Sequence, residues 1–403
     1  MISPLHPASR KECSSMTRLI LLSLLTAVLS GCSSMNPLNW LADEDNAEQP
    51  AELSEMANKI EPEILWKRSI GAGTDEQRVK LVPLVSQGKV YVAERNGNVR
   101  ALAADTGNEI WSVDTDLEIS GGPGLGNGII LLGTSNAELV ALDMETGAQK
   151  WRSLVSSEVL SVPTAARGVV VVHTVDGKLF GMDPSSGEQL WLYDRSIPVL
   201  TLHGSSSPVI SGNQVICGFA SGKLAGLDLD TGVPVWETTI TSPGGRSELE
   251  RMVDIDSDPL IVQDAVFVTT YQGDLAAVFK DTGVVAWRRK LSAYAGMAAD
   301  WKRLFVSDSN DHVWAIDPRN SSAIWKNKYL QARQISGPAV LDEYVIVGDY
   351  EGYLHWLSPD DGSLLARISV GKKPITVPPI VVDEVAYVYG SGGELAAIRL
   401  PKP

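Results

Sequence analysis

Short apolar runs recur along the chain from residue 63 onward, and they either alternate with polar residues or continue without interruption. Examples are KVYVAE at 89–94 and VVVVHT at 169–174. Such runs are typical of β-strands, because an amphipathic helix would instead place its apolar residues three and four positions apart. The pattern therefore predicts a chain made of strands.

Tight turns separate the runs. The dipeptides NG at 96–97, DG at 176–177 and SG at 221–222 suit two-residue hairpins, in which the backbone needs positive φ. A second kind of turn, such as DMETG at 143–147, has an Asp that can accept hydrogen bonds from nearby backbone N–H groups and a Gly at the left-handed position. Together the turns predict antiparallel pairing of consecutive strands.

The runs and turns belong to one unit that recurs eight times, as in GPGLGNGIILLGTSNAELVALDMETGAQKW at 122–151. A period of about 40 to 50 residues indicates a propeller, a solenoid or another repeat array. A large, rigid indole closes six of the units and is suited to wedging between neighbouring sheets. The six are Trp111, Trp151, Trp191, Trp236, Trp287 and Trp325, while the seventh unit has Ala366 or Arg367 in that place.

The eighth unit ends early. SGGELAAIRLPKP at 391–403 lacks the last turn and the outermost strand of the other units, whereas EILWKRSI at 63–70, with Trp66, has the character of such a strand but no unit before it. A ring closed by its own N-terminal segment removes exposed sheet edges. The sequence predicts an all-β fold, an eight-bladed β-propeller of four-stranded antiparallel blades over residues 63–400, closed by an N-terminal outer strand.

Residues 1–31 precede the propeller as an export signal. An 11-residue apolar run at 19–29 is too short to span a bilayer and suits a signal-peptide core after a start at Met1 or Met16. The LSGC that ends at Cys32 resembles a lipobox, which implies lipidation of Cys32 and, with Ser33 next to it, sorting to the outer membrane. An ordinary secretion signal cut near Ala27 is the alternative. The acidic residues 32–62 are expected to form a flexible tether that begins with the lipidated Cys32.

Charge and cysteine content narrow the function. The formal net charge of −15 disfavours binding to nucleic acid or to anionic lipid, although it permits attraction to a basic protein surface. Cys217 is the one cysteine within the repeats, and we expect it to be a small core residue. No disulfide is expected, so the stability must come from hydrophobic burial.

Candidate catalytic motifs are missing. The five histidines show no metal-ligand spacing, and no H-E-x-x-H or G-x-S-x-G sequence occurs. The ALDxxTGxxxW unit resembles the repeat of pyrroloquinoline-quinone (PQQ) dehydrogenases, which suggests a quinoprotein as an alternative function. The resemblance is incomplete, because no two cysteines adjoin and the units are too short for the inserts that build that site. We therefore expect no enzyme, no cofactor and no metal.

Connection lengths indicate where a binding site lies. From the Trp of one unit to the first Pro of the next there are 12 residues after Trp111 and after Trp151, but 17 after Trp191 and 23 after Trp236. Trp66 to Pro83 also gives 17. Surplus residues in a repeat protein gather on one face and commonly bind partners.

The content of two long connections supports this interpretation. RSIPVLTLHGSSSP at 195–208 contains Leu200 and Leu202 where a solvent-exposed loop would be polar, and TSPGGRSELERMVDIDSDP at 241–259 clusters Arg251 with Asp254 and Asp256. An apolar anchor beside a charged rim is typical of a protein-binding patch. Three roles remain open for the two aspartates: bonding within their own loop, pairing with Arg251 or Arg246, or contact with a basic partner.

With the LSGC motif, the eight repeated units, PVLTLHGSSSP and ERMVDIDSDP, the chain resembles the propeller lipoproteins of the bacterial outer-membrane β-barrel assembly (BAM) machinery. The resemblance implies a lipid-anchored scaffold at the outer membrane, facing the periplasm. It implies docking on the POTRA domains of BamA, the barrel-inserting subunit, and help for nascent outer-membrane proteins. The docking residues would be Leu200, Leu202, Asp254 and Asp256, while His203 stands where the family pattern has Arg.

Two other functions remain alternatives. One is a free-standing periplasmic propeller that binds a ligand in its central channel, and the other is a structural spacer in a different envelope complex.

Overall fold

The computed structural model describes residues 48–401, of which residues from Pro50 onward belong to one compact unit. The predicted signal peptide, the lipobox with Cys32 and the first part of the tether lie outside these residues. Residues 48–401 form strands and turns only, and no helix in this range is long and apolar enough to cross a membrane.

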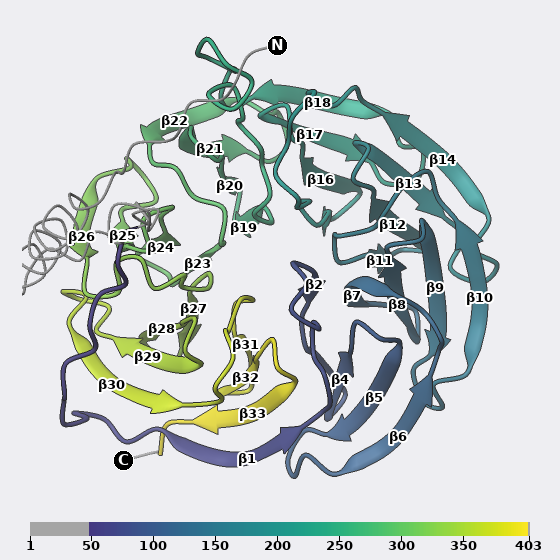
Figure 1. The fold of residues 1–403 in the computed structure, drawn as a ribbon. Helices are drawn as coiled ribbons and strands as arrows, with labels where there is room; N and C mark the ends of the chain where they lie inside the picture. Colours follow the sequence, from purple (N-terminus) through teal and green to yellow (C-terminus); the bar gives the residue numbers. More distant parts are fainter. Residues whose placement is uncertain (1–47, 402–403) are drawn as a thin grey trace, which may run out of the picture. The chain divides into compact units, whose positions relative to one another are not determined.

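Eight sheets surround a central axis, with the first strand of each blade on the inside and the fourth on the outside (Figure 1). Blade 1 contains β3 (Leu84–Ser86), β4 (Lys89–Ala93), β5 (Asn98–Ala103) and β6 (Glu109–Asp114). Blade 2 contains β7 (Ile119–Gly126), β8 (Ile129–Thr134), β9 (Glu138–Asp143) and β10 (Gln149–Leu154). Blade 3 contains β11 (Thr164–Ala166), β12 (Val169–His173), β13 (Lys178–Met182) and β14 (Gln189–Asp194). Blade 4 contains β15 (Val209–Ser211), β16 (Gln214–Gly218), β17 (Lys223–Asp228) and β18 (Pro234–Thr239).

The second half of the ring repeats this order. Blade 5 contains β19 (Leu260–Val262), β20 (Ala265–Thr269), β21 (Asp274–Phe279) and β22 (Val285–Lys290). Blade 6 contains β23 (Met297–Ala299), β24 (Leu304–Ser307), β25 (Val313–Ile316) and β26 (Ala323–Asn327). Blade 7 contains β27 (Ala339–Leu341), β28 (Tyr344–Gly348), β29 (Tyr353–Leu357) and β30 (Leu364–Ser369). Blade 8 contains β31 (Ile380–Val382), β32 (Val385–Tyr389), β33 (Glu394–Arg399) and, as its outer strand, β1 (Glu63–Ser69).

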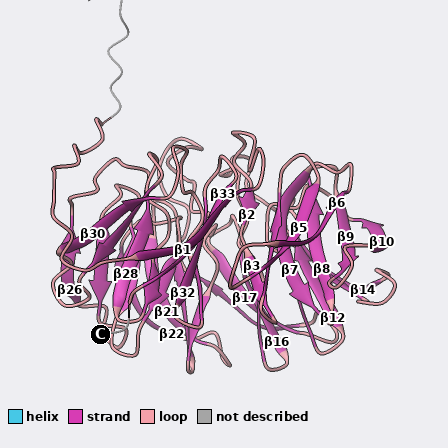
Figure 2. Ribbon diagram, turned by 90° about the horizontal axis from the view of Figure 1, so that it is seen from below, coloured by secondary structure: helices cyan, strands magenta, loops and turns pink. Residues whose placement is uncertain are grey.

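The predicted closure is confirmed. Strand β1 pairs antiparallel with β33, from Glu63 opposite Arg399 to Ser69 opposite Glu394, and it runs along the outside of the ring beside β33 (Figure 2). The all-β, eight-bladed architecture with four-stranded antiparallel blades is likewise as the repeats predict. One addition was not predicted: the short strand β2 (Lys80–Leu81) joins blade 2 as a fifth, parallel strand.

Tryptophans join neighbouring blades, as expected. In seven of the eight blade interfaces an indole Nε1 donates a hydrogen bond to a main-chain carbonyl in the turn between the third and fourth strands of the following blade. The pairs are Trp66–Ala104, Trp111–Met144, Trp151–Pro184, Trp191–Leu229, Trp236–Lys280, Trp287–Pro318 and Trp325–Pro359. The junction of blades 7 and 8 differs, because Ala366 replaces the indole and blade 8 has no such turn.

Apolar side chains fill the space between sheets, which explains how the fold manages without a disulfide. The valines of β12 and the alanines of β33 are buried, and Cys217 packs with Val169 and Val171 between blades 3 and 4. Each sheet buries both faces against its neighbours, so apolar clusters lie between the blades around the ring.

Residues 51–60 lie on the propeller before the expected first strand. Ala51 N donates to Gln331 O at 3.0 Å, and Lys59 N donates to Leu365 O at 2.7 Å, so the segment runs from blade 6 along the outer strand of blade 7. Leu53 and Ile60 pack against the blade cores. We call residues 51–60 the strap. Because Lys59 bonds to β30, the strap covers an edge strand that would otherwise face solvent.

Candidate functional site

The connections between consecutive blades emerge on one face of the ring, which we call the loop face. The face follows from the strand order, since each outer strand ends where the next inner strand begins. Two of the long connections, loop A (195–208) and loop B (241–259), flank blade 4 and lie on this face. The first requirement of the predicted site, that both loops share one surface, is met.

Loops A and B are hydrogen-bonded to each other. The backbone N–H of Leu202 donates to Asp254 Oδ1 at 2.9 Å, and the side chain of Asp254 is buried, with 1% of the residue exposed. Its other oxygen, Oδ2, has no hydrogen-bond partner among the described residues. Burial raises the pKa of Asp254 to about 6, because desolvation disfavours the carboxylate. Asp254 therefore joins loop B to loop A, an arrangement that differs from all three roles left open, because the donor belongs to loop A and not to the aspartate's own loop.

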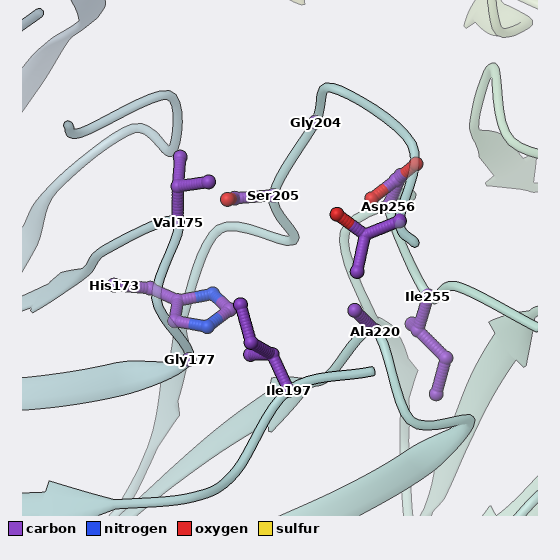
Figure 3. A pocket seen from close by; sticks show the side chains of 10 residues that line it. His173, Val175, Gly177, Ile197, Gly204, Ser205, Ala220, Ile255 and Asp256 are labelled. Carbon is purple, nitrogen blue, oxygen red and sulfur yellow. The ribbon is translucent and has the colours of Figure 1, made fainter. Parts of the chain in front are cut away.

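Asp256 lies under loop A. A Cβ added at Gly204 would come within 2.9 Å of the Asp256 carboxyl carbon, so a larger residue there would require the Asp256 side chain to shift. Figure 3 shows Asp256 on one side of a small pocket between the loops, with His173 and Val175 across from it. Burial, followed by the charge of Asp254, raises the pKa of Asp256 to about 7.

The serines of loop A hold its base. Ser205, Ser206 and Ser207 are buried, and Ser207 Oγ accepts a hydrogen bond from Val162 N at 3.0 Å. Ser206 O contacts His173 Nδ1 at 2.9 Å. The end of loop A is thus fixed to blade 3, and the rest of the loop projects from a rigid base.

Apolar side chains are exposed above this base. Val199 is 93% exposed and Leu200 42% exposed, whereas Leu202 is partly buried. Leu249, at the tip of loop B, is exposed as well. A group of exposed aliphatic side chains on a rigid loop is suited to insertion into an apolar groove of a partner.

The charged residues of the predicted site are either exposed at the rim or buried beneath the loops. Arg251 is exposed and forms no salt bridge with Asp254 or Asp256, so the proposed internal pairing with Arg251 is not the arrangement found among these residues. His203 is exposed, with Nε2 at 3.4 Å from Glu158 Oε2. Arg251 and His203 are therefore exposed at the rim of this surface, whereas Asp254 is buried beneath it.

Sequence reasoning missed a third element of this surface. The connection at 71–83, which we call loop C, also has the longer spacing, and Lys80 Nζ lies 2.5 Å from Asp258 Oδ1 at the end of loop B. The count from Trp66 to Pro83 was the signal that could have identified it.

The geometry defines a class of protein: a closed propeller of PQQ-like repeats in which two long loops with exposed apolar side chains lie on one face. A family model described as outer membrane protein assembly factor BamB matches residues 59–116 and 95–327. The outer membrane protein assembly factor BamB of Alkalilimnicola ehrlichii is 50% identical over 360 residues, which cover 89% of this chain and 94% of the relative. The chain belongs to the BamB family.

Solved structures agree on the fold. The crystal structure of BamB from Moraxella catarrhalis superposes with a TM-score of 0.77 at 25% identity, covering 84% of this chain and 100% of that one. The quinohemoprotein alcohol dehydrogenase of Comamonas testosteroni has a TM-score of 0.67 at 14% identity, covering 86% of this chain and 78% of that one. This second likeness concerns the propeller fold alone.

Proposed function

We propose that this chain is a non-catalytic scaffold subunit of the BAM machinery, which docks on the POTRA domains of BamA and assists the folding and insertion of outer-membrane proteins. Its membership of a family whose members are named outer membrane protein assembly factors supports the assembly role. The observation that carries the docking surface is the bond from Leu202 N to Asp254 Oδ1, because it holds an exposed apolar loop in one conformation before any partner arrives.

Each predicted docking residue has a distinct part in this proposal. Leu200 enters an apolar depression of the partner, and Leu202 extends that contact from its partly buried position. Burying a leucine side chain is worth about 1.5–3 kcal/mol, so these two residues supply the main free energy of docking. Their exposure on a fixed loop limits the entropy lost on binding.

The charged residues set orientation. Asp254 is buried beneath the loops and positions them, Asp256 lies beside it under loop A, and Arg251 and His203 form the rim. Rim charges act mainly on association rate and register rather than on affinity.

Anchoring completes the proposal. Lipidation at Cys32 would hold the propeller at the outer membrane on the periplasmic side, which puts loops A and B within reach of a membrane-embedded partner. Acyl chains on one cysteine bind the membrane firmly, because each additional chain adds apolar burial. Nascent outer-membrane proteins are possible further partners.

Purification of the lipidated chain from membranes tests the proposal. The parent should retain BamA after detergent extraction, and a Leu200→Ala, Leu202→Ala variant should lose it. Leu154→Ala is the matched control, since Leu154 is exposed on the outer strand β10 and lies away from loops A and B. If the parent retains no BamA, or if the control loses it equally, the proposed docking surface is wrong.

A further inference from the structure

Loop C begins at the blade 8 edge and is fixed there. Ala72 N donates to Glu94 Oε2 at 2.9 Å, and Thr74 N donates to Ser391 O at 2.9 Å. Gly71 is packed so closely on Glu94 that a Cβ there would lie 2.1 Å from the carboxylate oxygen. The start of loop C is thus held by blades 1 and 8 before the chain turns toward the axis.

The second half of loop C lies against the inner side of blade 2. Strand β2 pairs parallel with β7 through Lys80 opposite Gly121 and Leu81 opposite Gly122, and Val82 N donates to Gly122 O at 3.0 Å. Leu81 is fully buried. Figure 1 shows β2 on the inside of the ring, beside β7. This pairing fixes the backbone from which the Lys80 side chain extends.

Lys80 extends from there to the other two long connections. Its Nζ lies 2.5 Å from Asp258 Oδ1, and the same oxygen accepts a hydrogen bond from the backbone N–H of Ser207 at 2.6 Å. Asp258 ends loop B, and Ser207 ends loop A. All three connections with surplus length therefore meet at one carboxylate oxygen, although the residues that meet are far apart in sequence.

Lys80 also supplies positive charge where loop B is most negative. Asp254, Asp256 and Asp258 stand within five positions of one another, and the charge of Lys80 acts on Asp256 as well as on Asp258. Arg251, the nearest basic residue in sequence, forms no salt bridge with any of these three. A cation beside a carboxyl group that accepts a backbone N–H bond stabilises the ionised form of that group.

The pair is partly exposed, with 23% of the Lys80 side chain and 41% of the Asp258 side chain accessible. Exposed ion pairs contribute little to global stability. A loop can change conformation at a free energy far below that of global unfolding. The small contribution of the ion pair can therefore decide which conformation of the loop is populated. Lys80 is thus placed to set the loop conformation without being needed for the fold.

We propose that Lys80 is a positioning residue for partner docking, which holds loops A and B in their binding conformation through Asp258. The proposal rests on the proposed function for the identity of the partner. Loop C then acts as a brace from blade 8, across blade 2, to the docking loops beside blade 4. Strand β1, which closes the ring, directly precedes loop C in the chain. The brace therefore links the closing strand to the loops of the docking surface.

The test uses Lys80→Met, Lys80→Arg and Asp258→Asn in the otherwise intact chain, with Lys89→Met as control. Lys89 also forms a 2.5 Å ion pair, with Glu145, and its side chain is 19% exposed, but it follows the turn between β3 and β4 on the opposite face. Two quantities are measured: hydrogen exchange in peptides covering 195–208, and the dissociation constant for purified BamA POTRA domains.

Lys80→Met should weaken docking about two- to fivefold, the range expected for a partly exposed ion pair. It should speed exchange in loop A by a similar factor and leave the midpoint of thermal unfolding unchanged. Lys80→Arg should restore both quantities. In the Lys80→Met, Asp258→Asn double variant the two effects should not add, because both remove the same contact.

Three results would overturn the proposal. Unchanged exchange in loop A after Lys80→Met means that Lys80 does not hold the loop. Tighter docking means that Lys80 competes with the partner for the carboxylates. An equal effect of Lys89→Met means that the loss of any lysine weakens docking. If the parent itself does not bind the POTRA domains, the proposed function fails, and the exchange measurement still decides whether the brace exists.

Discussion

The indole of Trp66 lies directly on Gly107: a Cβ at Gly107 would come within 2.6 Å of the Trp66 ring. Trp66 belongs to β1, the outer strand of blade 8, whereas Gly107 lies in the last turn of blade 1, so this contact closes the ring. The Trp66 Nε1 also donates to Ala104 O at 2.9 Å in the same turn. The same Trp-on-Gly contact recurs at other blade interfaces, for example between Trp191 and Gly232.

Trp66→Ala should lower the free energy of unfolding by about 3–5 kcal/mol, because it removes a buried indole and leaves a cavity at the closing interface. Urea denaturation measures the loss. The control is Trp301→Ala, which removes an indole that is 82% exposed and should change the free energy of unfolding by at most about 0.5 kcal/mol. Equal effects of the two substitutions would show that ring closure does not depend on Trp66.

Truncation separates β1 from the strap. A chain that starts at residue 61 keeps β1 and loses only the strap contacts, so it should unfold at a moderately lower temperature than the parent. A chain that starts at residue 71 also loses the pairing with β33, which exposes a sheet edge. We expect that second chain to be far less stable and prone to association. Indistinguishable melting of the two chains would contradict closure by the N-terminal strand.

Replacing Leu200 and Leu202 together by Ala should weaken binding to BamA POTRA domains by about two to four orders of magnitude, from about 1.5–3 kcal/mol for each side chain. Leu200→Ala alone should leave thermal unfolding unchanged because the side chain is exposed, while Leu202→Ala should cost a little stability. Titration calorimetry measures the affinity. Should the double variant unfold, the two leucines belong to the core and another part of the loop face binds the partner.

The repeat made most of the fold predictable, because the sequence of each unit indicates its strands, its turns and the Trp that packs between neighbouring blades. Closure was predictable too, since an incomplete last unit and a surplus first strand complement each other. The positions of Leu200 and Asp254 could be located because the loops that carry them interrupt a regular spacing. These are all local or periodic signals.

The features that could not be predicted depend on long-range contacts that lie outside the repeat pattern. Lys80 and Asp258 are 178 positions apart, and nothing in the sequence near either residue indicates the other. The strap is acidic and lacks aromatics over 51–60, so its composition favoured a flexible tether, yet it docks through a few aliphatic side chains. The burial of Asp254 and Asp256 was not predictable either, because loop A, which covers them, lies far away in sequence, with Leu202 52 positions from Asp254.

A buried ion-pair network should hold blade 7 and the strap. Arg333, 2% exposed, donates to Asp349 Oδ2 at 2.8 Å and to Ala51 O at 2.9 Å, while His355 Nε2 contacts the same Asp349 oxygen at 2.9 Å. Arg333→Met should lower the free energy of unfolding by about 3–5 kcal/mol, because the Asp349 charge stays buried without its main partner. Chemical denaturation measures the loss, and hydrogen exchange in 51–60 should rise.

Arg319→Met is the control for Arg333, since Arg319 pairs with Asp317 on the surface at 2.7 Å. An exposed pair contributes at most about 1 kcal/mol. If both substitutions cost the same, the Arg333 network adds no more than a surface ion pair. If Arg333→Met destabilises the chain without faster exchange in 51–60, the strap is held by its aliphatic contacts instead.

The two aspartates of loop B should make stability depend on pH. Their pKa values are raised in the folded protein, to about 6 for Asp254 and about 7 for Asp256, from 3.8. The folded state therefore binds protons more tightly than the unfolded state, and the contribution of the pair to stability is full below about pH 4 and is lost as the pH rises through 6 and 7. Because the two carboxyl groups interact, they titrate as a pair.

The parent and a variant with Asp254→Asn and Asp256→Asn are compared by urea denaturation at pH 4.5, 6 and 8. The amide at position 254 can still accept the Leu202 N–H, so the loop contact survives while the charge is removed. The variant should gain stability relative to the parent as the pH rises, with the difference levelling off above about pH 8. A stability difference that does not change with pH would mean that these carboxyl groups titrate normally in the folded protein, and that loop B is open to water rather than packed under loop A.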